Sequence, residues 1–179
     1  MFTASGNVAA AGVHVGGLVG SVKVRSNTND YDVSISTAHA TGDVKTTYAD
    51  ASSDQVARVG GLVGYLDHSK DLTNVTATGD VASKSGGAVG GLVGTLAQVD
   101  TNHVVDNASA TGNVTAPGDE VGGLIGQYNK GGGIETSYAR GNVTSDGDYV
   151  GGLVGDSGGY SDVGSFIDSY ARGDVNSSG

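Results

Sequence analysis

The side chains best suited to chemistry are two tyrosine–arginine pairs near the end of the sequence. Tyr138 is followed two positions later by Arg140, and Tyr170 by Arg172. Residues two apart in a strand share a face, so each pair is predicted to present an aromatic ring beside a guanidinium. Such a surface can bind a glycan or a partner protein, and it can equally stabilise neighbouring strands by stacking. Both interpretations remain open from the sequence, with simple stabilisation favoured.

Oxygen-bearing side chains give weaker candidates for metal binding and modification. Asp119, Asp146 and Asp148 precede two Val-Gly-Gly segments, and calcium prefers several oxygen ligands. No complete calcium loop is present, so solvated turn carboxylates are the preferred interpretation and no cofactor is expected beyond possible calcium. Five Asn-x-Ser/Thr sequons are candidate N-glycosylation sites: Asn74, Asn107, Asn113, Asn142 and Asn176.

A row of Asp and Asn residues recurs at one phase of a repeat. Its members each follow a glycine: Asn7, Asp43, Asp80, Asn113, Asn142 and Asp174. Carbohydrate-cleaving enzymes on parallel β-helices need carboxylates clustered at one place, whereas this row returns in every copy. The four histidines share no spacing to a carboxylate. The row therefore predicts a structural ladder at a turn, and the chain is predicted not to be an enzyme.

The composition limits which side chains can fill a core and which classes of partner the chain can bind. The 179 residues include 33 Gly but only two Phe and no Trp, so a core must be built from small residues. The formal net charge of -10 repels nucleic acid and anionic membranes. This acidity suits either a halophilic source or an ordinary acidic extracellular domain. Without Cys, thiolate chemistry is excluded, and no apolar run is long enough to insert into a membrane.

Two motifs alternate along the whole chain. VGGLVG stands at 15–20, 59–64, 89–94 and 150–155, with VGGLIG at 121–126. A Gly-Asp/Asn-Val motif stands between and around these copies, at 6–8, 42–44, 79–81, 112–114, 141–143 and 173–175. Repeats near thirty residues with matched short strands favour stacking of each strand on its counterpart in the next copy.

Each repeat contains three short runs of β character, and helical periodicity is absent. The predicted fold is all-β: a Gly-rich, right-handed parallel β-solenoid (β-helix) of about five coils with three short strands per coil. It forms one repeat domain over 1–179, with repeats at roughly 5–41, 42–78, 79–111, 112–140 and 141–172. Longer spacings place loop insertions in the first full coil, at about 21–36 and 45–57.

Identical residues at the same position of every repeat predict ladders, that is, rows of like side chains stacked inside the solenoid. Alanine stands two residues before the second-motif glycine, at 40, 77, 110, 139 and 171, and valine two residues after it, at 44, 81, 114, 143 and 175. The leucines of VGGLVG are expected to point inward as a third ladder. Strict alternation would put leucine and its flanking valine on opposite faces, so either a bulge at the Gly pair or a second buried layer is required.

The recurrent VGGLVG followed by segments such as SYARG and NVTATG resembles the GLUG repeat. This resemblance implies a module of large bacterial or archaeal surface proteins, including adhesin-like ones, and supplies no catalytic residue. Three hypotheses follow: a structural or adhesive repeat module, a glycan- or protein-binding module using the Tyr/Arg face, and a filament subunit that stacks end to end through uncapped ends. The expected location is extracellular or on the cell surface, with a targeting signal outside this chain.

Overall fold

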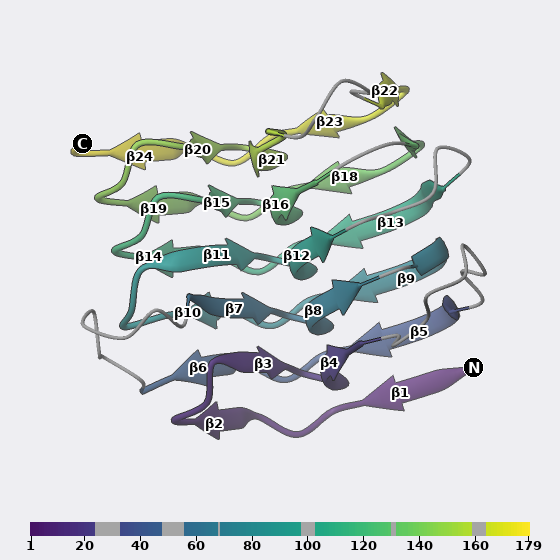
Figure 1. The fold of residues 1–179 in the computed structure, drawn as a ribbon, viewed down its shortest axis with the longest axis horizontal. Helices are drawn as coiled ribbons and strands as arrows, with labels where there is room; N and C mark the ends of the chain where they lie inside the picture. Colours follow the sequence, from purple (N-terminus) through teal and green to yellow (C-terminus); the bar gives the residue numbers. More distant parts are fainter. Residues whose placement is uncertain (24–32, 48–55, 68, 98–102, 130–131, 159–163) are drawn as a thin grey trace.

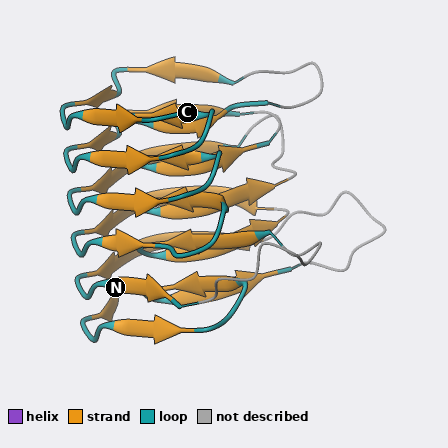
Figure 2. Cartoon of the chain, turned by 90° about the vertical axis from the view of Figure 1, so that its left-hand side faces the viewer, coloured by secondary structure: helices purple, strands orange, loops and turns teal. Residues whose placement is uncertain are grey.

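The computed structural model describes residues 1–23, 33–47, 56–67, 69–97, 103–129, 132–158 and 164–179. Every described element is a β-strand, and every strand pair is parallel, with each strand beside its counterpart from the next repeat (Figure 1). Successive coils stack from the N-terminal to the C-terminal end of the chain, as the turned view also shows (Figure 2). The prediction of an all-β parallel solenoid is confirmed.

The strands form four sheets, here called A to D in the order in which the chain visits them. Sheet A consists of β1 (Phe2–Ala4), β5 (Val33–Ala40), β9 (Ser69–Ala77), β13 (Val104–Ala110), β17 (Gly133–Glu135), β18 (Tyr138–Ala139), β22 (Ser165–Ile167) and β23 (Tyr170–Ala171). Sheet B consists of β2 (Val8–Ala10), β6 (Val44–Thr46), β10 (Val81–Ala82), β14 (Val114–Ala116), β19 (Val143–Ser145) and β24 (Val175–Ser177).

The other two sheets are built from the VGGLVG segments. Sheet C consists of β3 (His14–Gly16), β7 (Ala57–Gly60), β11 (Gly87–Gly90), β15 (Val121–Gly122) and β20 (Val150–Gly151). Sheet D consists of β4 (Val19–Val22), β8 (Val63–Asp67), β12 (Val93–Ala97), β16 (Ile125–Tyr128) and β21 (Val154–Asp156). A coil therefore contains four strand positions instead of the three expected, because each VGGLVG segment is divided between two sheets.

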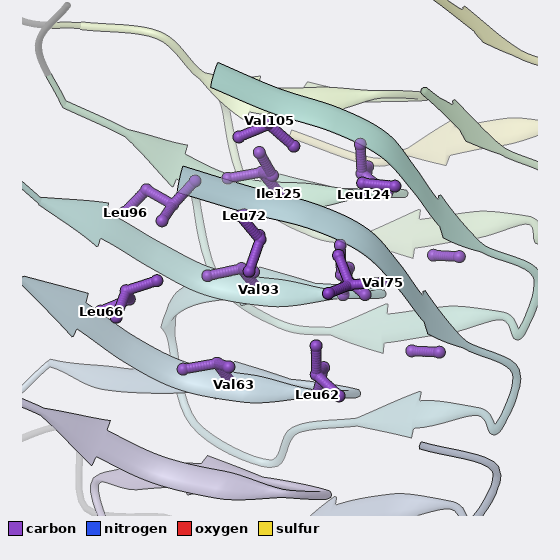
Figure 3. Close-up of a cluster of buried hydrophobic side chains, with 14 of the residues drawn as sticks. Leu62, Val63, Leu66, Leu72, Val75, Val93, Leu96, Val105, Leu124 and Ile125 are labelled. Atoms are coloured by element: carbon purple, nitrogen blue, oxygen red, sulfur yellow. The ribbon is translucent and has the colours of Figure 1, made fainter. Parts of the chain in front are cut away.

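The four sheets enclose two apolar cores. Side chains of sheets A and D form the larger core, which contains Leu62, Leu66 and Val75 (Figure 3). Side chains of sheets B and C form the smaller one, where Val44 packs with Val59. Because A continues into B and C into D, each coil is a flattened loop of two layers, and small residues suffice to fill the space between them.

A corner within VGGLVG explains how leucine and its flanking valines are all buried. In the second copy, Val59 points into the B/C core, whereas Leu62 and Val63 point into the A/D core. The change of direction falls at Gly60 and Gly61, between β7 and β8. The leucine ladder therefore faces inward, as expected. The second-layer alternative accounts for Val59, whereas Val63 shares the A/D core with Leu62.

The alanine ladder packs against the second glycine of this corner. A Cβ placed on Gly91 would lie 2.8 Å from the Cβ of Ala110, and one on Gly61 would lie 2.8 Å from the Cβ of Ala77. Ala77 and Ala110 are at most 1% exposed. Glycine on one layer and alanine on the other thus let the two layers approach closely in every coil.

Parts of both expected loop insertions are strands in the structure. Part of the first insertion belongs to strands β4 and β5, and part of the second to β6 and β7. The remaining positions, 24–32 and 48–55, lie outside the described residues. In the last coil described, Val175 of the valine ladder is 44% exposed.

Candidate functional site

Sheet A brings the two predicted Tyr/Arg pairs together on its outer face. Strand β18 pairs in parallel with β23, which puts Tyr138 beside Tyr170 and Ala139 beside Ala171. Ala139 is buried in the A/D core, so the residues on either side of it point outward. The four residues Tyr138, Arg140, Tyr170 and Arg172 are called the Tyr/Arg surface below.

The Tyr/Arg surface is ordered by stacking. The rings of Tyr138 and Tyr170 lie parallel, with centroids 5.4 Å apart and planes 9° apart. The Arg140 guanidinium lies 4.6 Å from the Tyr138 centroid, and that of Arg172 lies 5.0 Å from the Tyr170 centroid. Arg140 also donates from Nη2 to the Tyr170 hydroxyl at 3.1 Å, and this hydrogen bond raises the pKa of Arg140. The Arg140 guanidinium is therefore held against both tyrosines, and that of Arg172 lies over the ring of Tyr170.

The Asp/Asn row forms the predicted ladder at the turn between sheets A and B. Each side-chain Oδ1 accepts a hydrogen bond from the backbone N–H of the equivalent residue in the next coil. The donor and acceptor pairs, at 2.7 to 3.0 Å, are Asp43 to Asn7, Asp80 to Asp43, Asn113 to Asp80, Asn142 to Asn113, and Asp174 to Asn142. The carboxylates of this row are thus structural hydrogen-bond acceptors.

The structure reveals a second aromatic and cationic cluster, which the sequence pattern did not predict. It lies across the corner between sheets C and D, where Arg58 stands 4.7 Å from the ring centroid of Tyr65. The His14 ring stacks on Tyr65 at 5.1 Å, and the Nζ of Lys23 lies 5.5 Å from the same centroid. Arg58 Nη1 lies 3.1 Å from His14 Nε2, so the guanidinium donates to a neutral imidazole.

The signal for this cluster is the pair of residues that flank each VGGLVG segment. Arg58 precedes the second copy and Tyr65 follows it, seven residues later. The same spacing joins Glu120 and Gln127, whose side chains hydrogen-bond across the corner at 2.7 Å. Burial, followed by the nearby Asp156, raises the pKa of Glu120. Outward residues on the two sides of the corner therefore face each other.

Acidification is expected to destabilise the cluster around His14. Burial, and then the charges of Arg58 and Lys23, lower the pKa of His14 below its ordinary value of 6.5. The unfolded chain therefore binds this proton at a higher pH than the folded chain, so stability falls as pH decreases from about 6.5 through the lowered pKa. Urea unfolding of the wild type and of His14→Gln between pH 7.5 and 5 measures this effect.

The difference between the two proteins isolates His14 from the other titrating groups. The wild type is expected to lose more stability on acidification than the variant, in which the glutamine side chain keeps an oxygen acceptor for Arg58 but has no proton to gain. Parallel pH profiles for the two proteins would show that His14 is not coupled to folding.

The calcium candidates are only partly brought together. Asp148 donates its backbone N–H to Oδ1 of Asp119 at 3.4 Å, and Asp146 accepts from the Ser178 hydroxyl at 2.8 Å. Within the described ranges no group of three or more His, Cys, Asp or Glu residues is arranged to hold a metal ion. In this geometry the carboxylates of Asp119 and Asp146 accept hydrogen bonds from neighbouring coils.

All five sequon asparagines are exposed, and four of them make ladder contacts. Asn113 and Asn142 belong to the Asp/Asn ladder. Asn74 and Asn107 adopt left-handed backbone angles, with φ of 54° and 49°, and Asn107 Nδ2 donates to Asn74 Oδ1 at 2.7 Å. Asn176 lies in β24. The nitrogen that would carry a glycan is therefore hydrogen-bonded at Asn107.

In the portion of the chain that the structure describes, no helix could span a membrane.

Comparison with known proteins agrees with this repeat architecture. The model of the GLUG motif matches residues 56–82, which hold the second VGGLVG copy and the following TGDV, so the chain carries a GLUG motif. Over 129 residues, or 72% of the chain, the sequence is 56% identical to Halomucin of Haloquadratum walsbyi. The chain spans about 1% of the length of that relative. No solved structure matches the chain.

Proposed function

We propose that this chain is a rigid, non-catalytic structural repeat of a secreted or surface-anchored protein, which serves as a spacer or adhesive array in a high-salt environment. The observation that carries the proposal is the Asp/Asn ladder, which joins each coil to the next by the same hydrogen bond. An active site would interrupt the repeat at one coil, whereas here the polar row continues through all of them.

The relatives and the charge support the location. The similar segment belongs to Halomucin of Haloquadratum walsbyi, and the name Halomucin indicates a mucin-like protein of a salt-loving organism. A net charge of -10 with many exposed carboxylates keeps a protein soluble where salt screens its self-repulsion. The VGGLVG segment inside the GLUG match stands, with one near copy, at five places along the chain, which suits a spacer.

Hydrogen exchange on Asn113→Ala tests the rigidity of the ladder. In the wild type, the backbone N–H groups of Asp80, Asn113 and Asn142 are expected to exchange as slowly as those of the neighbouring strands. Removing the Asn113 oxygen leaves the Asn142 N–H, now bonded at 3.0 Å, without its acceptor. We expect faster exchange at Asn142 and a loss of stability of about 0.5 to 1.5 kcal/mol.

Asn113→Asp is the matched control, because Asp43 and Asp80 already serve as acceptors in the same ladder. It should retain slow exchange at Asn142. Fast exchange of the ladder N–H groups in the wild type would mean that the coils open locally and would refute a rigid spacer.

The Tyr/Arg surface supports a second candidate, a module that binds a glycan or a protein ligand. Its four side chains are gathered on two neighbouring coils at the outer face of sheet A, and Arg140 and Arg172 are exposed. For this candidate, the double variant Tyr138→Ala/Tyr170→Ala should lose ligand binding while its far-UV circular dichroism stays unchanged.

A further inference from the structure

We propose that the Tyr/Arg surface binds acidic polysaccharide, with the guanidinium groups of Arg140 and Arg172 holding the anionic groups of the polymer. This inference rests on the binding-module candidate and specifies its ligand. It depends on which parts of the four side chains remain available to a ligand.

The tyrosine rings already make contacts within the Tyr/Arg surface. Tyr138 and Tyr170 stack on each other, and each also carries a guanidinium over its ring. A neutral sugar usually binds an aromatic ring through the face of that ring. These contacts occupy part of the rings and leave the exposed guanidinium groups, beside a Tyr170 that is 37% exposed, as the charged feature open to a ligand.

The guanidinium groups keep most of their donors. A guanidinium has five N–H groups, and the cation–π contact uses its flat face and leaves the edges exposed. Within the described residues, the contacts of Arg140 and Arg172 are the two tyrosine rings and the Tyr170 hydroxyl. Free edges of this kind bind carboxylate or sulfate groups in a bidentate manner.

The spacing suits a polymer that runs along the stacking direction. Tyr138 and Tyr170 are direct register partners, so the two pairs are separated by one strand spacing of about 4.8 Å. The phase occupied by Arg140 and Arg172 is threonine in the earlier coils, at the exposed residues Thr41, Thr78 and Thr111. These hydroxyls can bond to sugar hydroxyls, so a polysaccharide that follows the row would find hydrogen-bonding partners beyond the two arginines.

The overall negative charge does not prevent such binding. The net charge of -10 opposes the approach of an anion, but charges more than about 8 Å apart are largely screened in about 0.15 M salt. At about 1 M, nearer the high-salt environment proposed above, this distance falls to about 3 Å. Direct contacts to two preorganised guanidinium groups are screened far less.

Binding to dextran sulfate, measured in 0.15 M salt against neutral dextran of the same length, tests the proposal. The wild type is expected to bind only the sulfated polymer. Arg140→Gln/Arg172→Gln should raise the Kd at least tenfold. Lys45→Gln/Lys84→Gln removes the same charge at exposed positions in and after strands of sheet B, and should change the Kd less than threefold.

Each contrary result overturns the proposal in a distinct way. No binding by the wild type, or equal loss in the arginine and lysine variants, would exclude a specific anion surface. Binding of polyglutamate as tight as that of dextran sulfate would indicate an acidic protein partner instead. If a neutral glycan binds and only Tyr138→Ala/Tyr170→Ala abolishes it, the surface remains a binding module but the anionic ligand is refuted.

Discussion

Gly91→Ala is expected to unfold the solenoid or to destabilise it by at least about 3 kcal/mol. A Cβ at this buried corner would lie 2.8 Å from the Cβ of Ala110 and still closer to the carbonyl oxygen of Gly123 in the next coil. Neither obstacle is the end of a flexible side chain, so the backbones of two coils must separate. Because Gly91 is in the third of five corners, this separation would interrupt both cores in mid-stack. Urea unfolding followed by far-UV circular dichroism measures the loss.

Gly6→Ala is the matched control. Nothing lies within 4 Å of a Cβ at Gly6, which is exposed in the first coil. The extra methyl should leave stability unchanged or raise it slightly, because alanine restricts the unfolded chain. Equal stability of Gly91→Ala and Gly6→Ala would show that the layers are not in the close contact described.

The stacked coils could be predicted because the same residues return at the same phase. Alanine, valine and leucine positions keep their identity in every copy, which is required only if each copy touches its counterpart. The Asp/Asn ladder followed from the same argument. Its hydrogen bonds, side chain to the backbone of the next coil, confirm that the row is structural.

The corner within VGGLVG could not be predicted, since a Gly pair is compatible with a bulge, a turn or a close approach of another backbone. The sequence therefore indicates three β runs per repeat, whereas the structure has four strands. The burial of both Val59 and Leu62 shows which alternative holds, because they enter different cores. Only knowledge of the opposite layer, with alanine facing the second glycine, distinguishes a corner from a bulge.

The two polar clusters differ in how far the sequence could reveal them. The Tyr/Arg surface was predictable because a tyrosine and an arginine stand on either side of a ladder alanine in two successive repeats. The cluster of His14, Arg58 and Tyr65 was not, because its members face each other only when the chain turns at the glycines between them. The residues that flank a Gly-Gly corner are thus the ones to compare in related repeats.

Leu92→Ala is expected to destabilise the protein by about 2 to 5 kcal/mol. Leu92 is fully buried in the A/D core, and the leucines of the coils below and above, Leu62 and Leu124, are also fully buried in it. Its removal would leave a cavity that a stacked backbone cannot close, because each coil is held in register by its neighbours. Total stabilities of domains are about 5 to 15 kcal/mol, so much of the native stability would be lost. Urea unfolding measures it.

Leu153→Ala and Leu92→Met separate cavity formation from other effects. Leu153 holds the same phase in the fifth corner but is only partly buried, so its truncation should cost clearly less than that of Leu92. Leu92→Met conserves volume and should cost less than about 1.5 kcal/mol. Equal losses at Leu92 and Leu153 would contradict an inward leucine ladder whose packing is completed by coils on both sides. The predicted gradient, largest in the middle of the stack, follows from the way each coil depends on its neighbours for burial.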